Sequence, residues 1–179
     1  RTVIPFEEIP EIVKQATVAA EDINFYKHSG IDWRGIVRAA LKNLARGNIA
    51  QGGSTITQQL VKNSLLGPER TFRRKIREQI LAIILERKYS KDEILEFYLN
   101  QIPYGSNAYG IYAAAQTYFA KEVKELTSAE AAMLAALPKA PTYYSPYGSR
   151  KEELLSRRNW ILERMADEGF IDKKEAERA

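Results

Sequence analysis

Cysteine is absent from the 179-residue chain, and histidine occurs once, at His28. The lack of cysteine excludes disulfides, thiol nucleophiles and cysteine-ligated zinc or iron–sulfur sites, and one histidine cannot build a multi-histidine metal site. Long apolar runs are also missing, because the longest, residues 131–137, is too short to cross a bilayer core of about 30 Å. The chain starts at Arg1 without a signal peptide, so we expect any targeting or anchoring segment to lie outside it.

The composition is typical of a folded globular domain. Hydrophobic residues make up 45% and charged residues 28% of the chain, which excludes a disordered or collagen-like protein. The net charge of +4 is concentrated, because no acidic residue occurs from Trp33 to Pro68. Such a local excess of cations favours an anionic partner such as phospholipid, diphosphate or nucleic acid, but no nucleic-acid motif is present.

Apolar residues recur at helical spacing along much of the chain. The pattern predicts helices from Pro10 to about Glu21, over about residues 33–46, from Ser54 as N-cap to Asn63, and over about residues 71–88. Residues 47–53, which are rich in glycine, are predicted to form a mobile loop. The fourth helix is predicted to bury an apolar stripe, which consists of Phe72, Ile76, Ile80, Ile83 and Ile84.

Four capping-box patterns predict further helix starts, because each places a side-chain acceptor three residues before a glutamate. They pair Ser90 with Glu93, Thr127 with Glu130, Ser149 with Glu152, and Asp172 with Glu175. Prolines between Leu137 and Ser149 predict a loop, and no alternating run with hairpin turns demands a sheet. The predicted fold class is therefore mainly α.

Glu21 and Asp22 stand at the end of the first predicted helix, beside Ala19 and Ala20, whose small side chains permit close packing. A carboxyl group that is desolvated, or that lies beside another negative charge, has a raised pKa and is a better general base. The alternative is a solvated acidic helix end. Taken by itself, the single histidine, His28, is more typical of a hydrogen-bonded structural residue.

The glycine-rich loop leads into a helix with many hydroxyl, amide and ammonium groups. These polar residues are Ser54, Thr55, Gln58, Gln59, Lys62 and Asn63. A helix N-terminus suits phosphate or sugar hydroxyls, whereas the residue order matches neither a Walker loop nor a serine-hydrolase elbow. A polar loop with an exposed helix face is the alternative.

Cations crowd around the start of the fourth predicted helix, at Arg70, Arg73, Arg74, Lys75 and Arg77. Cations at a helix N-terminus oppose the macrodipole, at roughly a few tenths of a kcal/mol each, which indicates an anionic ligand. Glu78 lies one turn beyond Arg74 and Lys75 and can pair with them. A charged surface helix without a ligand is the alternative.

The second predicted helix is basic and amphipathic. Its cations and apolar residues include Trp33, Arg34, Ile36, Val37, Arg38, Leu41 and Lys42. Near anionic lipid each cation contributes about 1 kcal/mol to membrane binding, so the segment can hold the domain on a membrane only if its apolar residues also insert. A core helix with a solvated basic face is the alternative.

Five collinear motifs resemble those of the family 51 peptidoglycan glycosyltransferases, found as N-terminal domains of class A penicillin-binding proteins and as monofunctional enzymes. They are Glu21-Asp22-x-x-Phe25-x-x-His28-x-Gly30, Gly53-Ser54-Thr55-Ile56-Thr57-Gln58-Gln59-Leu60-Val61-Lys62-Asn63, Arg74-Lys75-x-x-Glu78-x-x-x-Ala82-x-x-Leu85-Glu86, Lys91-x-x-Ile94-Leu95-Glu96-x-Tyr98-Leu99-Asn100 and Gly105-x-x-Ala108-Tyr109-Gly110.

This resemblance implies a single, two-lobed domain with a lysozyme-like helical core and a smaller membrane-facing lobe that includes about residues 31–53. It implies polymerisation of lipid II into β-1,4-linked glycan, with inversion and release of undecaprenyl diphosphate. The expected location is the outer face of the bacterial cytoplasmic membrane, with a transpeptidase domain in the parent protein. Moenomycin-type inhibitors are expected to bind, and no cofactor is required, although some family members respond to Mg²⁺ or Mn²⁺.

The resemblance also assigns roles. Glu21 is the expected base, and Glu78 is expected either to position the cations of the diphosphate site or to assist the leaving group. Lys62, Arg70, Arg74 and Lys75 are the expected diphosphate ligands. Asp22, Phe25, His28, Ser54, Thr55, Gln58, Gln59, Asn63 and Arg77 complete the expected substrate site.

Two other functions stay open on the sequence. A lysozyme-like muramidase or lytic transglycosylase is also helical and also uses a glutamate, but its sugar leaving group needs a protonated acid rather than a cation cluster. A non-catalytic membrane-binding module would use the basic segments without turnover.

Overall fold

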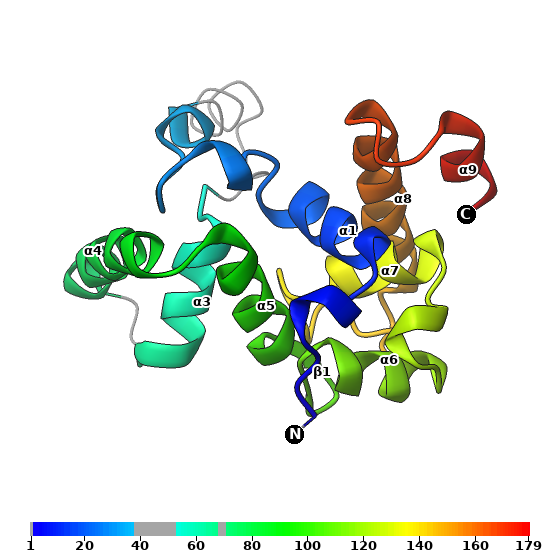
Figure 1. The fold of residues 1–179 in the computed structure, drawn as a ribbon. Helices are drawn as coiled ribbons and strands as arrows, with labels where there is room; N and C mark the ends of the chain where they lie inside the picture. Colours follow the sequence, from blue (N-terminus) through cyan, green and yellow to red (C-terminus); the bar gives the residue numbers. More distant parts are fainter. Residues whose placement is uncertain (1, 38–52, 68–70) are drawn as a thin grey trace. The chain divides into compact units, whose positions relative to one another are not determined.

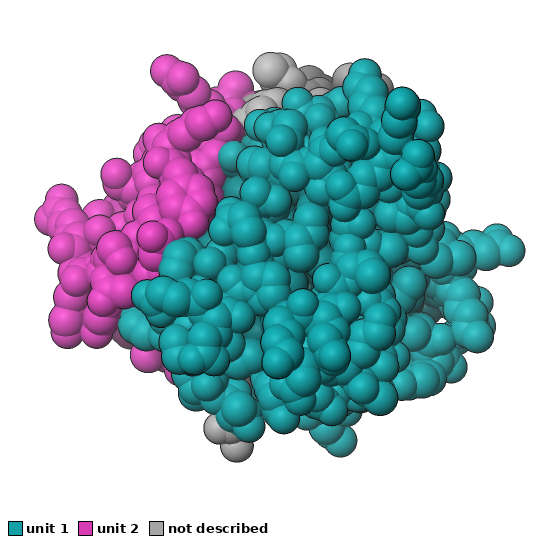
Figure 2. All heavy atoms as spheres, turned by 45° about the vertical axis from the view of Figure 1, so that its right-hand side comes forward, with its two compact units in different colours: residues 1–23, 95–179 teal, residues 24–94 magenta. Residues whose placement is uncertain are grey.

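The computed structural model describes residues 2–37, 53–67 and 71–179, and most of them are helical (Figure 1). The chain divides into two compact units. The first consists of residues 1–23 and 95–179, and the second of residues 24–94 (Figure 2). The division falls within helix α5 (Lys91–Gln101). Residues 31–53, the predicted smaller lobe, belong to the second unit's range, and residues 38–52 lie outside the described residues.

The first unit is built around three helices that pack against one another: α1 (Glu11–Glu21), α7 (Ser128–Ala136) and α8 (Lys151–Asp167). Fully buried alanines such as Ala16 and Ala19 on α1 and Ala132 on α7 allow this close packing. The remaining elements are η1 (Phe6–Glu8), β1 (Pro103–Gly105), β2 (Ala108–Tyr109), α6 (Ile111–Phe119), η3 (Val123–Glu125) and α9 (Lys173–Arg178). The helical packing holds the C-terminal end of α1, where Glu21 lies.

A short antiparallel hairpin, β1–β2, follows α5. Its two loop residues, Ser106 and Asn107, both have positive φ (48° and 59°), as a type I′ turn requires. Gly110 after the hairpin has φ +83°, and a Cβ there would lie 2.5 Å from the Asn100 carbonyl oxygen. Only glycine therefore allows this close approach. The low strand content predicted from the sequence is confirmed among the described residues.

The second unit contains η2 (Phe25–Lys27), helical residues 33–37, α3 (Ile56–Leu65) and α4 (Phe72–Lys88). Helices α3 and α4 pack side by side (Figure 1). Gly30 has φ +88°, and a Cβ at this position would lie 3.0 Å from the backbone carbonyl of Ala82 on α4. The chain after the first motif therefore runs directly against α4, which explains the pairing of a glycine with a small residue.

Most predicted helix boundaries are confirmed, and two caps are wrong. The Ser90–Glu93 and Thr127–Glu130 boxes are formed, whereas Asp172 only accepts from the Glu175 N–H. Helix α8 has Arg150 as its N-cap and no side-chain cap, so the Ser149–Glu152 box is absent. Helix α3 is capped by Thr55 rather than Ser54, because Thr55 and Gln58 form the reciprocal capping box.

Four of the five residues in the predicted apolar stripe of α4 are exposed, which contradicts the prediction that the stripe is buried. Phe72 is 90% exposed, and Ile76, Ile80 and Ile84 are 51–55% exposed, whereas Ile83 is half-buried. The buried residues of α4 are Glu78 and Ala82. Since positions two apart lie about 200° around a helix, burial of 78 and 82 turns 80 and 84 outward. The packing face of α4 is therefore its face with a charge and a small residue.

No helix within the described residues is both long and apolar enough to cross a membrane.

Candidate functional site

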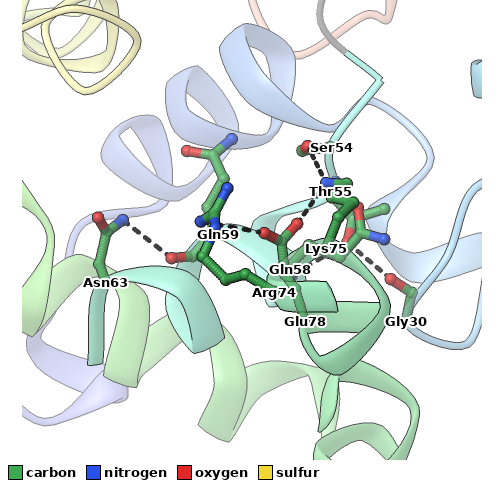
Figure 3. A network of polar contacts seen from close by, with 9 residues as sticks. All are labelled: Gly30, Ser54, Thr55, Gln58, Gln59, Asn63, Arg74, Lys75 and Glu78. Carbon is green, nitrogen blue, oxygen red and sulfur yellow. Dashed lines mark hydrogen bonds and ion pairs between the residues drawn. The ribbon is translucent and has the colours of Figure 1, made fainter. Parts of the chain in front are cut away.

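The N-terminus of α3 holds most of the predicted polar residues of the second unit. The Thr55 hydroxyl donates to the Gly30 carbonyl over 2.7 Å and accepts from the Gln58 N–H, while the Gln58 side chain accepts from the Thr55 N–H. Thr55 and Gln58 are both buried. These hydrogen bonds fix the backbone turn that leads into α3. Gln59 is half-buried, and Asn63, one turn later, donates to the Gln59 carbonyl and is exposed (Figure 3).

The first turns of α4 place two cations on a buried carboxylate. Lys75 Nζ pairs with Glu78 Oε1, and Arg74 Nη1 lies 3.7 Å from Glu78 Oε2. Lys75 also donates to the Ser54 hydroxyl over 3.0 Å, so it links α4 to the start of α3 (Figure 3). The Glu78 side chain is 2% exposed, whereas that of Lys75 is 41% exposed. Glu78 therefore fixes both cations while leaving Lys75 accessible.

A cavity of about 740 Å³ opens between the end of α3 and the start of α4. Three of the described residues that line it are cations, Lys62, Arg74 and Lys75, and none of the described lining residues is a carboxylate. The other lining residues are Asn63, Leu66, Gly67, Thr71 and Phe72. The cavity thus offers positive charge together with two large apolar side chains, which suits an anionic ligand with an apolar part.

Two buried donors of this region have no hydrogen-bond partner among the described residues. They are Arg74 Nε and Gln58 Nε2. An unpaired buried donor costs roughly 1–3 kcal/mol, so such groups in a native protein call for an explanation. Arg74 lines the cavity, so a ligand there that accepts hydrogen bonds would pair with its Nε.

Phe25 and His28 of the first motif also belong to the second unit. The Phe25 ring is fully buried and meets the His28 ring edge-on at 6.3 Å, and Lys91 Nζ lies 4.4 Å from the Phe25 ring centre. Phe25 therefore supports the motif by packing. His28 is half-buried beside it.

Glu21 lies in the first unit, at the last residue of α1, and its side chain is 8% exposed. Arg157 of α8 donates from Nη2 to Glu21 Oε1 over 2.9 Å. Asp22, the C-cap of α1, is buried. An ion pair of this kind forms with the ionised carboxylate, which is the form that a general base needs.

Three further titratable groups of the first unit sense the charge of Glu21. Burial, and then the Glu21 carboxylate, raise the pKa of both Tyr98 and Tyr104, so both phenols stay neutral. Burial and the Arg157 charge lower the pKa of Lys139, while Glu21 acts in the opposite direction. Glu21 and Arg157 thus stand among neutral phenols and one additional cation.

Arg157 was missed in the sequence analysis, although a signal exists. On α8 it falls between Leu154 and Ile161, three residues after one and four before the other, and both are buried with Met165. A cation on the buried stripe of an amphipathic helix needs a counter-charge, but the sequence does not say which one.

The other predicted site residues are exposed, half-buried or outside the described residues. Arg77, Trp33, Arg34 and Val37 are exposed, and Ile36 is half-buried. Arg70, Arg38, Leu41 and Lys42 lie outside the described residues. Within the described ranges no group of three or more histidine or acidic side chains could hold a metal ion.

The comparisons with known proteins give one family. The transglycosylase family model matches residues 1–166. Penicillin-binding protein 1A of Aquifex aeolicus is 55% identical over 179 residues, which are all of this chain and 24% of that protein. Penicillin-binding protein 1F of Bacillus subtilis is 50% identical over 176 residues, 98% of this chain and 24% of that protein.

A solved structure agrees with these matches. The crystal structure of penicillin-binding protein 1A from Haemophilus influenzae covers all of this chain with 17% of its own length, at a TM-score of 0.58 and 28% identity. The chain thus spans about a quarter or less of the relatives named here. It belongs to the transglycosylase family, as a glycosyltransferase domain related to penicillin-binding proteins 1A and 1F.

Proposed function

We propose that this domain polymerises lipid II, joining the 4-hydroxyl of an incoming disaccharide to C1 of the lipid-linked chain. Glu21 takes the hydroxyl proton as the new C1–O bond forms, and the C1–O bond to the diphosphate breaks with inversion. The electron pair leaves with the diphosphate, whose charge Lys62, Arg74 and Lys75 stabilise. The step needs no cofactor, although a divalent cation could be held by the diphosphate itself.

The cation-lined cavity of the second unit is the observation that carries this proposal. Its described lining has three cations and no carboxylate, together with the apolar side chains of Leu66 and Phe72, and Arg74 Nε is a buried donor without a partner among the described residues. A lipid diphosphate has this combination of negative charge and hydrocarbon. Asn63 in the same lining supports contacts with sugar or phosphate, and moenomycin-type phosphoglycolipids share these features.

The leaving group separates this proposal from hydrolysis of finished glycan. A sugar alkoxide must be protonated as it departs, which demands a carboxylic acid. A diphosphate is stable as an anion and needs cations instead. Glu21, paired with Arg157, fits a base better than an acid. Glu78 lies with Arg74 and Lys75, so we assign it the positioning of these cations rather than proton transfer.

The exposed face of α4 supports association with an anionic membrane. Its apolar stripe, Phe72, Ile76, Ile80 and Ile84, is accompanied by the exposed cations Arg73 and Arg77. The acidic side chains of the helix, Glu78 and Glu86, are only 2% and 5% exposed. An apolar stripe flanked by cations is typical of a helix that lies in a lipid interface. The exposed Trp33 and Val37 are further apolar groups of this unit.

This location suits a domain of a larger cell-wall enzyme. The relatives are named penicillin-binding proteins and are about four times longer than the matched region. We therefore propose action at the outer face of the cytoplasmic membrane, alongside a transpeptidase domain in the parent protein.

Chain growth from labelled lipid II in vesicles tests the proposal. Elongated glycan with release of the lipid diphosphate is expected. Shortening of finished glycan without elongation would favour the muramidase or lytic transglycosylase, and binding to vesicles without any turnover would favour the non-catalytic module.

A further inference from the structure

We propose that Arg157 is a positioning residue of the reaction, which holds the Glu21 carboxylate fixed in direction for proton abstraction. The inference rests on the proposed function, in which Glu21 is the base, and it adds a residue outside the five motifs.

Arg157 of α8 forms hydrogen bonds to residues of two other helices, α1 and α7. Its Nη2 donates to Glu21 Oε1 over 2.9 Å, and its Nε donates to the carbonyl of Ala136 at the end of α7 over 3.1 Å. Its side chain is 9% exposed. Because the guanidinium is planar, two bonds to partners on α1 and α7 fix its orientation, and so fix the carboxylate that it grips.

Two aromatic rings support the other side of this arginine. The guanidinium carbon lies 5.7 Å from the Tyr144 ring centre and 5.5 Å from the Trp160 ring centre. Such contacts are within the range of cation–π attraction. The rings limit the rotamers of Arg157, so its contact with Glu21 is formed before substrate binds.

Other titratable groups also sense the charge of Glu21. Tyr98 from α5 and Tyr104 from β1 have raised pKa values and are neutral phenols. Lys139, in the turn after α7, has its pKa lowered by partial burial and by the Arg157 charge. Arg157, by contrast, contacts the Glu21 carboxylate directly, at 2.9 Å.

Two variants separate charge from geometry. In Arg157→Gln the carboxylate loses both the cation and the planar fork that orient it, so kcat for lipid II is expected to fall by roughly 10²-fold, with little change in KM. In Arg157→Lys the charge is kept but the fork is lost, so kcat is expected to fall by roughly tenfold or more, again with little change in KM.

Arg158→Gln is the matched control. The neighbouring Arg158 is half-buried and bonds the side chain of Asn159, over 2.7 and 3.0 Å. Its removal changes the net charge as Arg157→Gln does, yet we expect the wild-type kcat and KM. A purely structural role of Arg157 would lower thermal stability but leave the kcat of the folded protein unchanged in both Arg157 variants, which would overturn the inference.

A second measurement does not depend on turnover. Crystal structures of wild type, Arg157→Gln and Arg158→Gln compare the direction of the Glu21 side chain. The carboxylate is expected to keep one ordered rotamer in wild type and Arg158→Gln and to lose it in Arg157→Gln. The same ordered rotamer in all three proteins would contradict the proposal even if wild type elongates lipid II. A wild type that does not elongate lipid II would instead overturn the proposed function, with the Glu21 rotamer still deciding the role of Arg157.

Discussion

Glu78 in the second unit and Glu21 in the first are both buried and paired with cations, but the two pairs are built differently. Glu78 in the second unit is paired with Arg74 and Lys75 on its own helix, at three and four residues' distance. Glu21 in the first unit is paired with Arg157, 136 residues further along the chain. The first arrangement is local and the second depends on the packing of α1, α7 and α8.

The difference indicates different tasks. Around Glu78 the cations exceed the acid, and both line a cavity, so the carboxylate organises positive charge for an anion. Around Glu21 one guanidinium bonds both the carboxylate and a backbone carbonyl. A base needs such a fixed direction, whereas an anion site needs accessible charge.

The largest expected effect comes from removing the Glu21 charge. Glu21→Gln keeps the shape of the side chain but cannot accept the proton, so we expect chain growth from lipid II to fall by roughly 10² to 10⁴. Thermal unfolding should show a folded protein. Chain growth within a few fold of wild type would show that Glu21 is not the base.

Two glycine substitutions test how closely the backbone of the first unit is packed. Gly110→Ala in the first unit combines positive φ with a Cβ 2.5 Å from a carbonyl oxygen, so we expect about 3 kcal/mol lower stability. Gly169→Ala is the control, because it has φ +74° but nothing within 4 Å of a Cβ, and about 1–2 kcal/mol is expected. Equal losses in denaturant unfolding would mean that the close contact at Gly110 is not needed.

Membrane binding is predicted to distinguish the exposed helix faces of the two units. Ile76→Ser with Ile80→Ser on α4 removes about half of the exposed stripe, so partition onto anionic vesicles should weaken by roughly tenfold. Leu155→Ser on α8, which alters a 40% exposed side chain of the first unit, is the control. Vesicle sedimentation in which all three proteins bind alike would remove α4 as the lipid-facing surface.

The smallest effect is expected in the alkaline range. Because the pKa of Tyr98 and Tyr104 is raised by folding, the folded state binds these protons more tightly than the unfolded state does. Their contribution to stability is present below the unfolded pKa of about 10 and declines as pH rises above it. Tyr104→Phe should make this alkaline decline shallower in urea unfolding at pH 9 to 11, whereas an unchanged slope would exclude Tyr104 as its source.

Local features were largely predictable from the sequence. The extent of α4, the Glu78 pairs with Arg74 and Lys75, and the boxes at Ser90 and Thr127 depend on residues three or four apart. The helix cap at Thr55 was misplaced by one residue, because Ser54 is an equally good cap by type, and only the Gln58 partner decides between them.

Features that depend on tertiary packing were not predictable. Periodicity identified the apolar stripe of α4 but not its environment, since a helix face is buried only if another element covers it. The inward face of α4 is the one on which the backbone of Ala82 closely approaches Gly30. The Arg157–Glu21 pair was missed for the same reason, because nothing local to either residue names the other.

Binding of a short-chain prenyl diphosphate, followed by calorimetry, tests the division of tasks most directly. We expect Lys75→Gln to weaken binding of the diphosphate by roughly tenfold or more, since one charge-assisted contact is lost, and Glu21→Gln to bind it as wild type does. Wild-type affinity in Lys75→Gln, or a loss of affinity confined to Glu21→Gln, would contradict the assignment of diphosphate binding to Lys75 and not to Glu21.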